Sequence, residues 1–286
     1  MAIPVVPGRT LLADGDAFAY YCAGKDDTSP GAARTNMLSL IGAACRAGGC
    51  GSARILVTGR ASHKGHRYAI ARAKPYQAQR SGSRRPKNWE FLREILEAGV
   101  PGYPTEVTNT AEADDLFGKY SAQLGWRNVV VFTQDKDMHM VAGHHLDWAS
   151  LTLTEVPEGA WSVPHPKEGH VFGRKWFWLQ MLMGDSADNI PGLPKANGKL
   201  CGPVAAMKLL DSAQCEAHAA DTVMQLYELH YQDDWREAFF EQAILLWMRN
   251  DENSSALNVL APGNPLAGWE QAPIDAMLKR IAEAQV

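Results

Sequence analysis

The chain has 286 residues, 46% of them hydrophobic and 21% charged, as expected of a globular protein with one large α/β domain or two small ones. No apolar run approaches the roughly 18 residues of a membrane span, and the start "MAIPVVPGRT" lacks the basic and apolar regions of a signal peptide. The five cysteines are odd in number and form no C-x-x-C pair, which indicates a reduced, cytoplasmic protein.

Short apolar runs alternate with helical patterns in the first part of the chain. Continuous β-rich runs, as in strands buried on both faces, predict strands at 10–13, 54–58 and 128–133. Helices are predicted between them at 32–47, 89–98 and 112–124, and a further edge strand at 151–156. This alternation predicts a parallel sheet with helices on both faces.

From about residue 174 the strand patterns stop and only helical patterns follow. Helices are predicted at 175–183, 203–210, 222–231, 235–250 and 273–284. We therefore predict an α/β region over residues 1–173 and a helical region over residues 174–286.

The net charge of −4 conceals a strongly basic segment. Residues 60–93 contain ten lysines and arginines and one acid, a local charge of +9, so the rest of the chain carries −13. Aromatic residues such as Tyr68 and Trp89 are interleaved with these cations, a pattern that suits phosphate contacts combined with base stacking. A solvated basic surface is the alternative interpretation. We expect this segment to contact nucleic acid.

Acidic residues follow the first and third predicted strands and also open the helix that begins near 112. The carboxyl edge of a parallel sheet is where ligands gather, so acids from separate strands would meet there. Taken singly, each acid also suits a structural role, as an N-cap, a turn residue or a partner of the helix dipole. Together with two acids of "MGDSADNIPGLP" there are eight such carboxylates: Asp14, Glu112, Asp114, Asp115, Asp135, Asp137, Asp185 and Asp188.

Such a concentration of negative charge requires cations, because neighbouring carboxylates raise one another's pKa. Oxygen ligands favour hard divalent ions, Mg²⁺ or Mn²⁺ before zinc. Two such ions would clamp the attacking and leaving oxygens of a phosphodiester. The acids therefore predict a two-ion site for phosphodiester hydrolysis.

Four ordered motifs, "DGD", "EADD", "TQDKD" and "GDSADNIPGLP", resemble those of the 5′-nuclease (flap endonuclease-like) superfamily over residues 10–211, and in particular its stand-alone phage 5′→3′ exonucleases. The resemblance implies a PIN-like fold with a helical arch at about 60–93. It also implies a helical 5′-3′ exonuclease C-terminal region with a helix–three-turn–helix at about 190–211. The implied activity is Mg²⁺-dependent hydrolysis of duplex DNA from 5′ ends, extending to flaps and to RNA primers paired with DNA.

The resemblance assigns the eight acids to the metal cluster, and Tyr76 and Arg80 of "RAKPYQAQR" to the substrate near the scissile phosphate. It implies a K⁺ site in the helix–three-turn–helix, where this chain has a longer loop with "KANGK" inserted. An acid expected after the second strand is absent, since Thr58 and Gly59 stand there. A lysine expected after the tyrosine is replaced by Gln77, and Lys74, one turn earlier on a helix, is the expected substitute.

The expected partner is DNA, bound by a monomer that works with replication proteins. Two alternatives are a PIN-type ribonuclease and a non-catalytic binder of branched DNA, the latter suggested by the absent second-strand acid. The cations expected to contact DNA are Arg67, Arg72, Arg84, Arg85, Lys87, Lys136, Lys195, Lys199 and Lys208.

Overall fold

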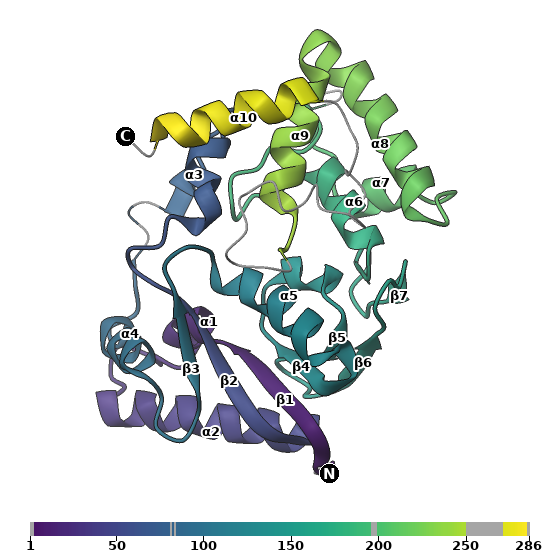
Figure 1. Cartoon of the computed structure of the whole chain (residues 1–286). Coiled ribbons are helices and arrows are strands. Elements are labelled where there is room, and N and C mark those ends of the chain that lie inside the picture. The colour runs from purple at the N-terminus through teal and green to yellow at the C-terminus, as the bar shows by residue number, and fades with distance from the viewer. Residues whose placement is uncertain (1–2, 81, 83, 196–198, 250–270, 285–286) are drawn as a thin grey trace. The chain divides into compact units, whose positions relative to one another are not determined.

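The computed structural model describes residues 3–80, 82, 84–195, 199–249 and 271–284. These residues form two compact units (Figure 1). Among the described residues, the first unit contains those of 1–64 and 83–158, and the second contains those of 65–82, 159–249 and helix α10. No helix in the described part of the chain has the length and apolar character needed to cross a bilayer.

A six-stranded sheet forms the centre of the first unit, in the order β3-β2-β1-β4-β5-β6. Every neighbouring pair is parallel except the last, where β6 runs antiparallel to β5. The predicted parallel sheet with an added edge strand is therefore confirmed. The strands are β1 (Val6–Asp14), β2 (Cys50–Thr58), β3 (Thr105–Thr108), β4 (Val129–Phe132), β5 (Gly143–Leu146) and β6 (Leu153–Val156).

Two of these strands were not predicted, because their sequences lack the apolar signal. β3 reads "TEVT" and β5 reads "GHHL". In β5 the buried His145 shares a 2.8 Å hydrogen bond with the carbonyl oxygen of Val141, so a polar ring is accommodated in a strand without an unsatisfied nitrogen there. Such local satisfaction cannot be read from hydrophobic periodicity.

Helices cover the sheet of the first unit, and their ends are marked by local sequence. The longest begins after Ser29, whose hydroxyl accepts from the amide of Ala32 at 3.2 Å, with Pro30 at its first position, and it ends at the left-handed Gly49. This helix, α2, packs against β1 and β2 and lies below them in Figure 1. The helices of the unit are α1 (Gly15–Tyr21), α2 (Pro30–Gly48), α4 (Trp89–Ala98) and α5 (Ala113–Leu124).

The central strands are buried on both faces, as their continuous apolar runs predict. Leu11 and Ala13 join the core formed with α1, α2 and α4, whereas Leu12 between them is equally buried and points to the opposite face. The strands are therefore fixed from both sides, and so are the residues that follow their carboxyl ends.

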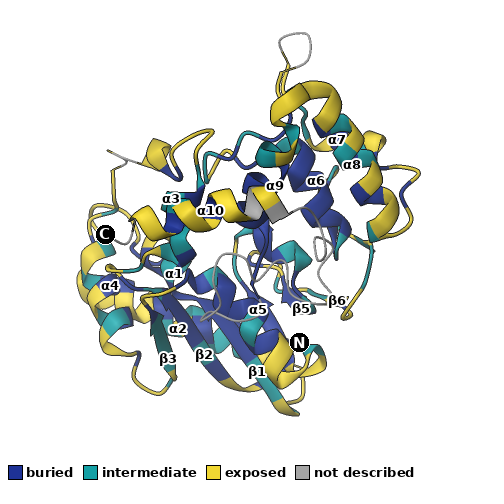
Figure 2. Cartoon of the chain, turned by 45° about the horizontal axis from the view of Figure 1, so that its top comes forward, coloured by how far each residue is buried: buried dark blue, intermediate teal, exposed yellow. Residues whose placement is uncertain are grey.

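The second unit is helical, with one small antiparallel pair of strands. Apart from Lys175 and Gln180, its central helix "KWFWLQMLM" consists of apolar residues, and eight of its residues are buried. Figure 2 shows this helix, α6, in the dark colour of buried residues. The elements are α3 (Arg67–Ile70), β7 (Val163–Pro164), β8 (Val171–Phe172), α6 (Lys175–Met183), α7 (Pro203–Leu209), α8 (Glu216–Tyr231), α9 (Trp235–Leu246) and α10 (Gln271–Ala284). Short 3₁₀ turns lie at Lys64–His66, Ala78–Arg80, Trp126–Asn128, Lys136–Met140 and Gln232–Asp234.

The basic segment 60–93 contains less helix than the resemblance implies. Its described residues form α3, the 3₁₀ turns at its start and near Arg80, and the first turns of α4. Residues 71–77 are not helical, so the expected helical turn from Lys74 to Gln77 is absent. Pro75 explains this, because a proline disfavours helix at the residue before it. Residues 81 and 83 of this segment, 196–198 of the inserted loop, and 250 at the end of a predicted helix lie outside the described residues.

We expect alanine at Gly184 or Gly192 to lower the free energy of unfolding of the second unit by about 2–5 kcal/mol. Both glycines have positive φ, and a Cβ on either would approach backbone atoms of the other's segment to within 2.2 Å. Chemical denaturation with fluorescence detection measures the change. Gly31→Ala, in open space on α2, is the control and should change stability by less than about 1 kcal/mol. Equal stability of all three variants would contradict this account of the turn.

Candidate metal centre

Asp14 ends β1 and caps α1 at the carboxyl edge of the sheet. Its Oδ1 accepts from the amide of Ala17 at 2.9 Å, and its Oδ2 accepts from the Thr133 hydroxyl at 2.7 Å. The side chain is buried, at 6% exposure. Because Thr133 directly follows β4, this hydrogen bond ties the ends of two adjacent strands together.

Asp135 and Asp137 follow β4 in a compact turn. The Thr133 hydroxyl accepts from the amide of Asp135 at 2.9 Å, and Asp135 in turn caps the 3₁₀ turn by accepting from the amide of Asp137 at 2.9 Å. Asp137 is buried, with Lys136 Nζ 3.2 Å from its Oδ1. The strand end therefore presents two carboxylates whose positions are set by backbone hydrogen bonds.

The third group of acids opens α5. Glu112 and Asp115 form a capping box, in which each side chain accepts from the other's backbone amide, and both are buried. Lys64 Nζ lies 3.2 Å from Glu112 Oε1. Asp114, between them in the first turn, takes no part in the capping box. A role in capping the helix therefore explains Glu112 and Asp115 but not Asp114.

Carboxylates of these three groups repel one another and lose hydration through burial, and both effects raise the pKa values of Asp14 and Asp114. Desolvation, and then repulsion from Asp16, raises the pKa of the Asp14 carboxyl to about 7, although its two hydrogen bonds oppose the rise. Desolvation, followed by repulsion from the surrounding carboxylates, raises the pKa of Asp114 well above its ordinary value. The repelling groups are Asp135, Asp14, Glu112 and Asp137. We call Asp14, Glu112, Asp114, Asp135 and Asp137 the acid cluster.

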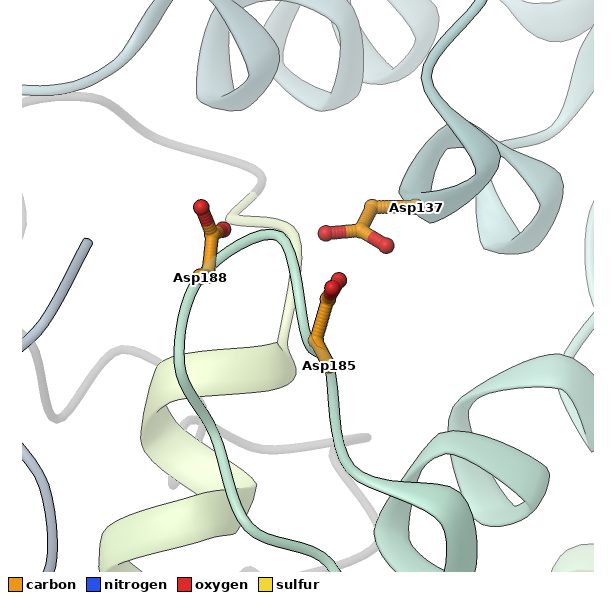
Figure 3. A group of neighbouring side chains, drawn as sticks. All are labelled: Asp137, Asp185 and Asp188. Atoms are coloured by element: carbon orange, nitrogen blue, oxygen red, sulfur yellow. The ribbon is translucent and has the colours of Figure 1, made fainter. Parts of the chain in front are cut away.

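Asp185 and Asp188, the remaining predicted ligands, lie in the second unit in the turn after α6. The turn closes through paired backbone hydrogen bonds of 2.8 and 2.7 Å between Asp185 and Ile190. Figure 3 shows the carboxylates of Asp185 and Asp188 pointing to the same side of this turn. Asp185 Oδ1 also accepts from the amide of Ala187 at 2.7 Å. The two acids that end the hydrophobic α6 are thus held in fixed positions.

The predicted substrate residues of the basic segment lie against this turn, within the same unit. Tyr76 and Arg80 both donate to the Asp188 carboxylate, at 3.0 and 2.5 Å. Lys74 is exposed, and no hydrogen bond or ion pair of its side chain is found with the described residues. Gln77, where a lysine is expected, also donates to Asp188, at 2.8 Å.

Thr58 stands at the end of β2, where the resemblance predicts an acid. Its hydroxyl accepts from the amide of Ala113 at 2.8 Å and so holds the start of α5. Its amide donates to both carboxylate oxygens of Asp16 at 3.3 Å. Asp16 Oδ1 also accepts a hydrogen bond from the Arg93 guanidinium. Asp16 was not among the predicted ligands, yet it brings a carboxylate to this strand end. The second acid of "DGD" was the only sequence signal for it.

The predicted DNA-contacting cations differ in exposure. Arg67 is buried at 1% exposure and donates to the carbonyl oxygen of Trp247 at 3.4 Å, so in this structure it is a core residue. Lys136 contacts Asp137 as described. Arg85 stacks over the Trp89 ring at 4.0 Å, which keeps its guanidinium at the surface. The exposed cations are Arg72, Arg84, Arg85, Lys87, Lys195, Lys199 and Lys208.

Comparison by sequence finds relatives among DNA polymerases and exonucleases. No family model matches the chain. The chain is 32% identical over 138 residues to DNA polymerase I of Bacillus subtilis, a match that covers 46% of this chain and 15% of the polymerase. It is 32% identical over 88 residues to a 5′-3′ exonuclease of Buchnera aphidicola subsp. Schizaphis graminum, covering 29% of each. The chain thus spans less than a third of the length of each relative.

Comparison by structure finds the fold of bacteriophage T5 nucleases. The flap endonuclease of bacteriophage T5, solved with DNA and metal ions, superposes with a TM-score of 0.64 at 15% identity, covering 96% of this chain and 98% of that one. The T5 5′-exonuclease with bound zinc gives a TM-score of 0.62 at 16% identity, covering 96% and 99%. The fold class is therefore that of the flap endonuclease type. Within that class, the sequence matches confirm the resemblance to 5′-3′ exonucleases.

We expect a divalent metal to stabilise the protein more at about pH 8 than at about pH 5.5. The pKa values of Asp14 and Asp114 are higher in the folded state than in the unfolded state. Between its unfolded-state and folded-state pKa, each carboxyl group therefore binds more protons in the folded state, so stability falls as pH rises toward about 7. A bound cation removes that loss at pH 8, but at pH 5.5 it must displace protons. Thermal unfolding with and without Mg²⁺ at both pH values measures the difference. An equal rise in Tm at both pH values would contradict the raised pKa values.

Proposed function

We propose that the protein is a divalent-metal-dependent 5′→3′ exonuclease that hydrolyses phosphodiester bonds of duplex DNA from 5′ ends, and also acts on flaps and on RNA primers paired with DNA. The observation that carries the proposal is the acid cluster at the carboxyl edge of the sheet. It lies in a fold shared with a flap endonuclease that has been solved with DNA and metal ions. The sequence similarity to a 5′-3′ exonuclease supports the direction of attack.

The residues of the acid cluster fit a hard divalent ion. All their side-chain donors are oxygens, and their mutual repulsion is relieved by added positive charge. We assign Asp14, Asp114, Asp135 and Asp137 as principal ligands of Mg²⁺ or Mn²⁺, with Glu112 and Asp115 also within the set. Asp185 and Asp188 are assigned on motif order alone. Two bound ions would supply Lewis-acid charge that activates water and stabilises the leaving oxygen.

The chain's own cations complete the proposed chemistry. Arg80 has a half-exposed guanidinium, which suits bidentate contact with a phosphate and stabilisation of charge in the transition state. The exposed Lys74 adds an ammonium group, and Tyr76 supplies a ring and a hydroxyl group. These three residues are assigned to the substrate near the scissile bond.

The exposed cations of the basic segment, of the α6–α7 loop and of α7 are assigned to the DNA backbone. The K⁺ site of the helix–three-turn–helix stays an expectation, because residues 196–198 of its loop lie outside the described residues. The proposal includes action as a monomer in the cytoplasm beside replication proteins. The monomeric state and the replication partners rest on the family resemblance, and the cytoplasmic location rests on the cysteine pattern.

We expect Asp114→Asn to abolish most cleavage and, without metal at about pH 8, to raise the Tm. The substitution removes a ligand, which costs several kcal/mol of transition-state stabilisation, and it also removes repulsion. Single-turnover cleavage of 5′-labelled duplex DNA and thermal unfolding measure the two effects. Glu158→Gln, an exposed acid of the same unit, is the control and should change neither.

Cleavage assays on duplex DNA, flapped DNA and single-stranded RNA separate the proposed exonuclease from the two alternative functions. Cleavage of 5′-labelled duplex and flapped DNA that requires a divalent metal supports the exonuclease. Metal-dependent cleavage of single-stranded RNA alone would instead indicate a PIN-type ribonuclease. Binding of branched DNA without cleavage at saturating Mg²⁺ or Mn²⁺ would indicate a non-catalytic binder, and the threonine at the end of β2 is the feature that favours this rival.

We expect DNA affinity to depend steeply on salt despite the net charge of −4. If about six phosphates are neutralised, log K should fall with log salt at a slope near −5. Replacing Arg84 and Arg85 by glutamine should reduce that slope by about 2, whereas Lys279→Gln on α10 should not change it. Fluorescence anisotropy with Ca²⁺ in place of Mg²⁺ measures binding without turnover. A flat salt dependence would exclude the basic segment as the DNA contact.

A further inference from the structure

The segment 75–80 is hydrogen-bonded along the turn 186–189 within the second unit. The Gln77 amide donates to the carbonyl oxygen of Asp188 at 3.1 Å, and Arg80 Nε donates to that of Ala187 at 3.0 Å. Further hydrogen bonds join Asn189 Nδ2 to the Pro75 carbonyl at 2.8 Å and Gln79 Nε2 to the Ser186 carbonyl at 2.9 Å. The segment expected to contact substrate is therefore docked on a predicted metal ligand.

Three side chains of this segment donate to the carboxylate of Asp188, and we call them the Asp188 clamp. Tyr76 donates to Oδ2, whereas Gln77 and Arg80 both donate to Oδ1. Tyr76 and Gln77 are buried, at 4% and 9% exposure, and Asp188 retains 14% of its side-chain exposure. Both carboxylate oxygens are thus oriented, but the group is not sealed from solvent.

The members of the clamp differ in charge and in freedom. Arg80 is charged and its side chain is 52% exposed, so it can leave Asp188 for a phosphate. Gln77 is neutral and buried, and it is held at φ +55°, a region that non-glycine residues rarely adopt. Both its backbone amide and its side-chain amide are committed to Asp188. Backbone outliers of this kind concentrate at functional sites.

We propose that Gln77 is a positioning residue for Asp188: it orients the carboxylate through a neutral donor, so that the negative charge becomes available to a divalent cation once Arg80 turns to a phosphate. The inference rests on the proposed function, in which Asp188 is a metal ligand. A carboxylate ligand is oriented by the hydrogen bonds of its surroundings, and loss of such a partner typically costs 10–100-fold in metal affinity. A lysine at position 77 would hold the same oxygen but would compete with the metal for its charge.

The experiment measures Mn²⁺ binding to the full chain without DNA, by isothermal titration and by electron paramagnetic resonance. Gln77→Met keeps the approximate volume of the side chain and removes the donor, and Gln77→Lys keeps a donor and adds charge. Both should weaken the Mn²⁺ site that Asp188→Asn weakens, by about 10–100-fold. The Mn²⁺ concentration that gives half-maximal cleavage should rise by the same factor.

Gln79→Ala is the matched control, because Gln79 donates to backbone carbonyls of the same turn and not to Asp188. It should change Mn²⁺ affinity by less than about threefold. If Asp188→Asn weakens binding while both Gln77 variants bind as the wild type does, the positioning role is overturned and the metal assignment survives. If the wild type binds no Mn²⁺, the proposed function fails together with this inference. Equal weakening by Gln79→Ala and Gln77→Met would show a general effect of the docked segment and overturn the specific role.

Discussion

Mutual repulsion among the carboxylates at the edge of the sheet is the constraint on which the candidate site depends. Asp14 and Asp114 cannot both ionise at neutral pH without cost, as their raised pKa values show. A protein optimised only for stability would have these carboxylates far apart or would carry amide side chains in their place. Keeping them together sacrifices stability in the metal-free state, as expected of a cluster that serves as the metal site proposed above.

The rest of the first unit prevents these carboxylates from moving apart. β1 and β4 are hydrogen-bonded in register from Thr10 to Ala13 and are buried, so their ends are rigid. The Thr133 hydroxyl joins Asp14 to the end of β4, and Thr58 holds the start of α5 through its own hydroxyl. Asp14 and the start of α5 are therefore preorganised by neutral hydroxyl groups, whereas Lys64 and Lys136 contact Glu112 and Asp137.

The sequence predicts the parts of this arrangement that depend on local pattern. The helices α4 and α6 and the central strands follow from periodicity, and the acids after β1 and β4 follow from the rule for parallel sheets. The docking of Gln77 on Asp188 joins residues 111 positions apart and has no local signature. Pro75 disfavours helix at the residue before it, whereas the family resemblance implies a helical turn from Lys74 to Gln77. The structure agrees with the effect of the proline. β5 was missed because its sequence lacks an apolar run, and the hydrogen bond that satisfies its buried His145 has no signature in the sequence.

The basic segment has a second role that its charge alone does not reveal, since several of its cations already neutralise acids. Lys64 pairs with Glu112, Arg93 with Asp16, and in the second unit Arg80 pairs with Asp188. These ion pairs stabilise the carboxylates before any divalent ion binds. In the proposed function, a bound metal would take over part of this neutralising role, and a cation such as Arg80 would then be available to a phosphate. The opposite charges of residues 60–93 and of the rest of the chain therefore already interact within each unit, through these internal ion pairs.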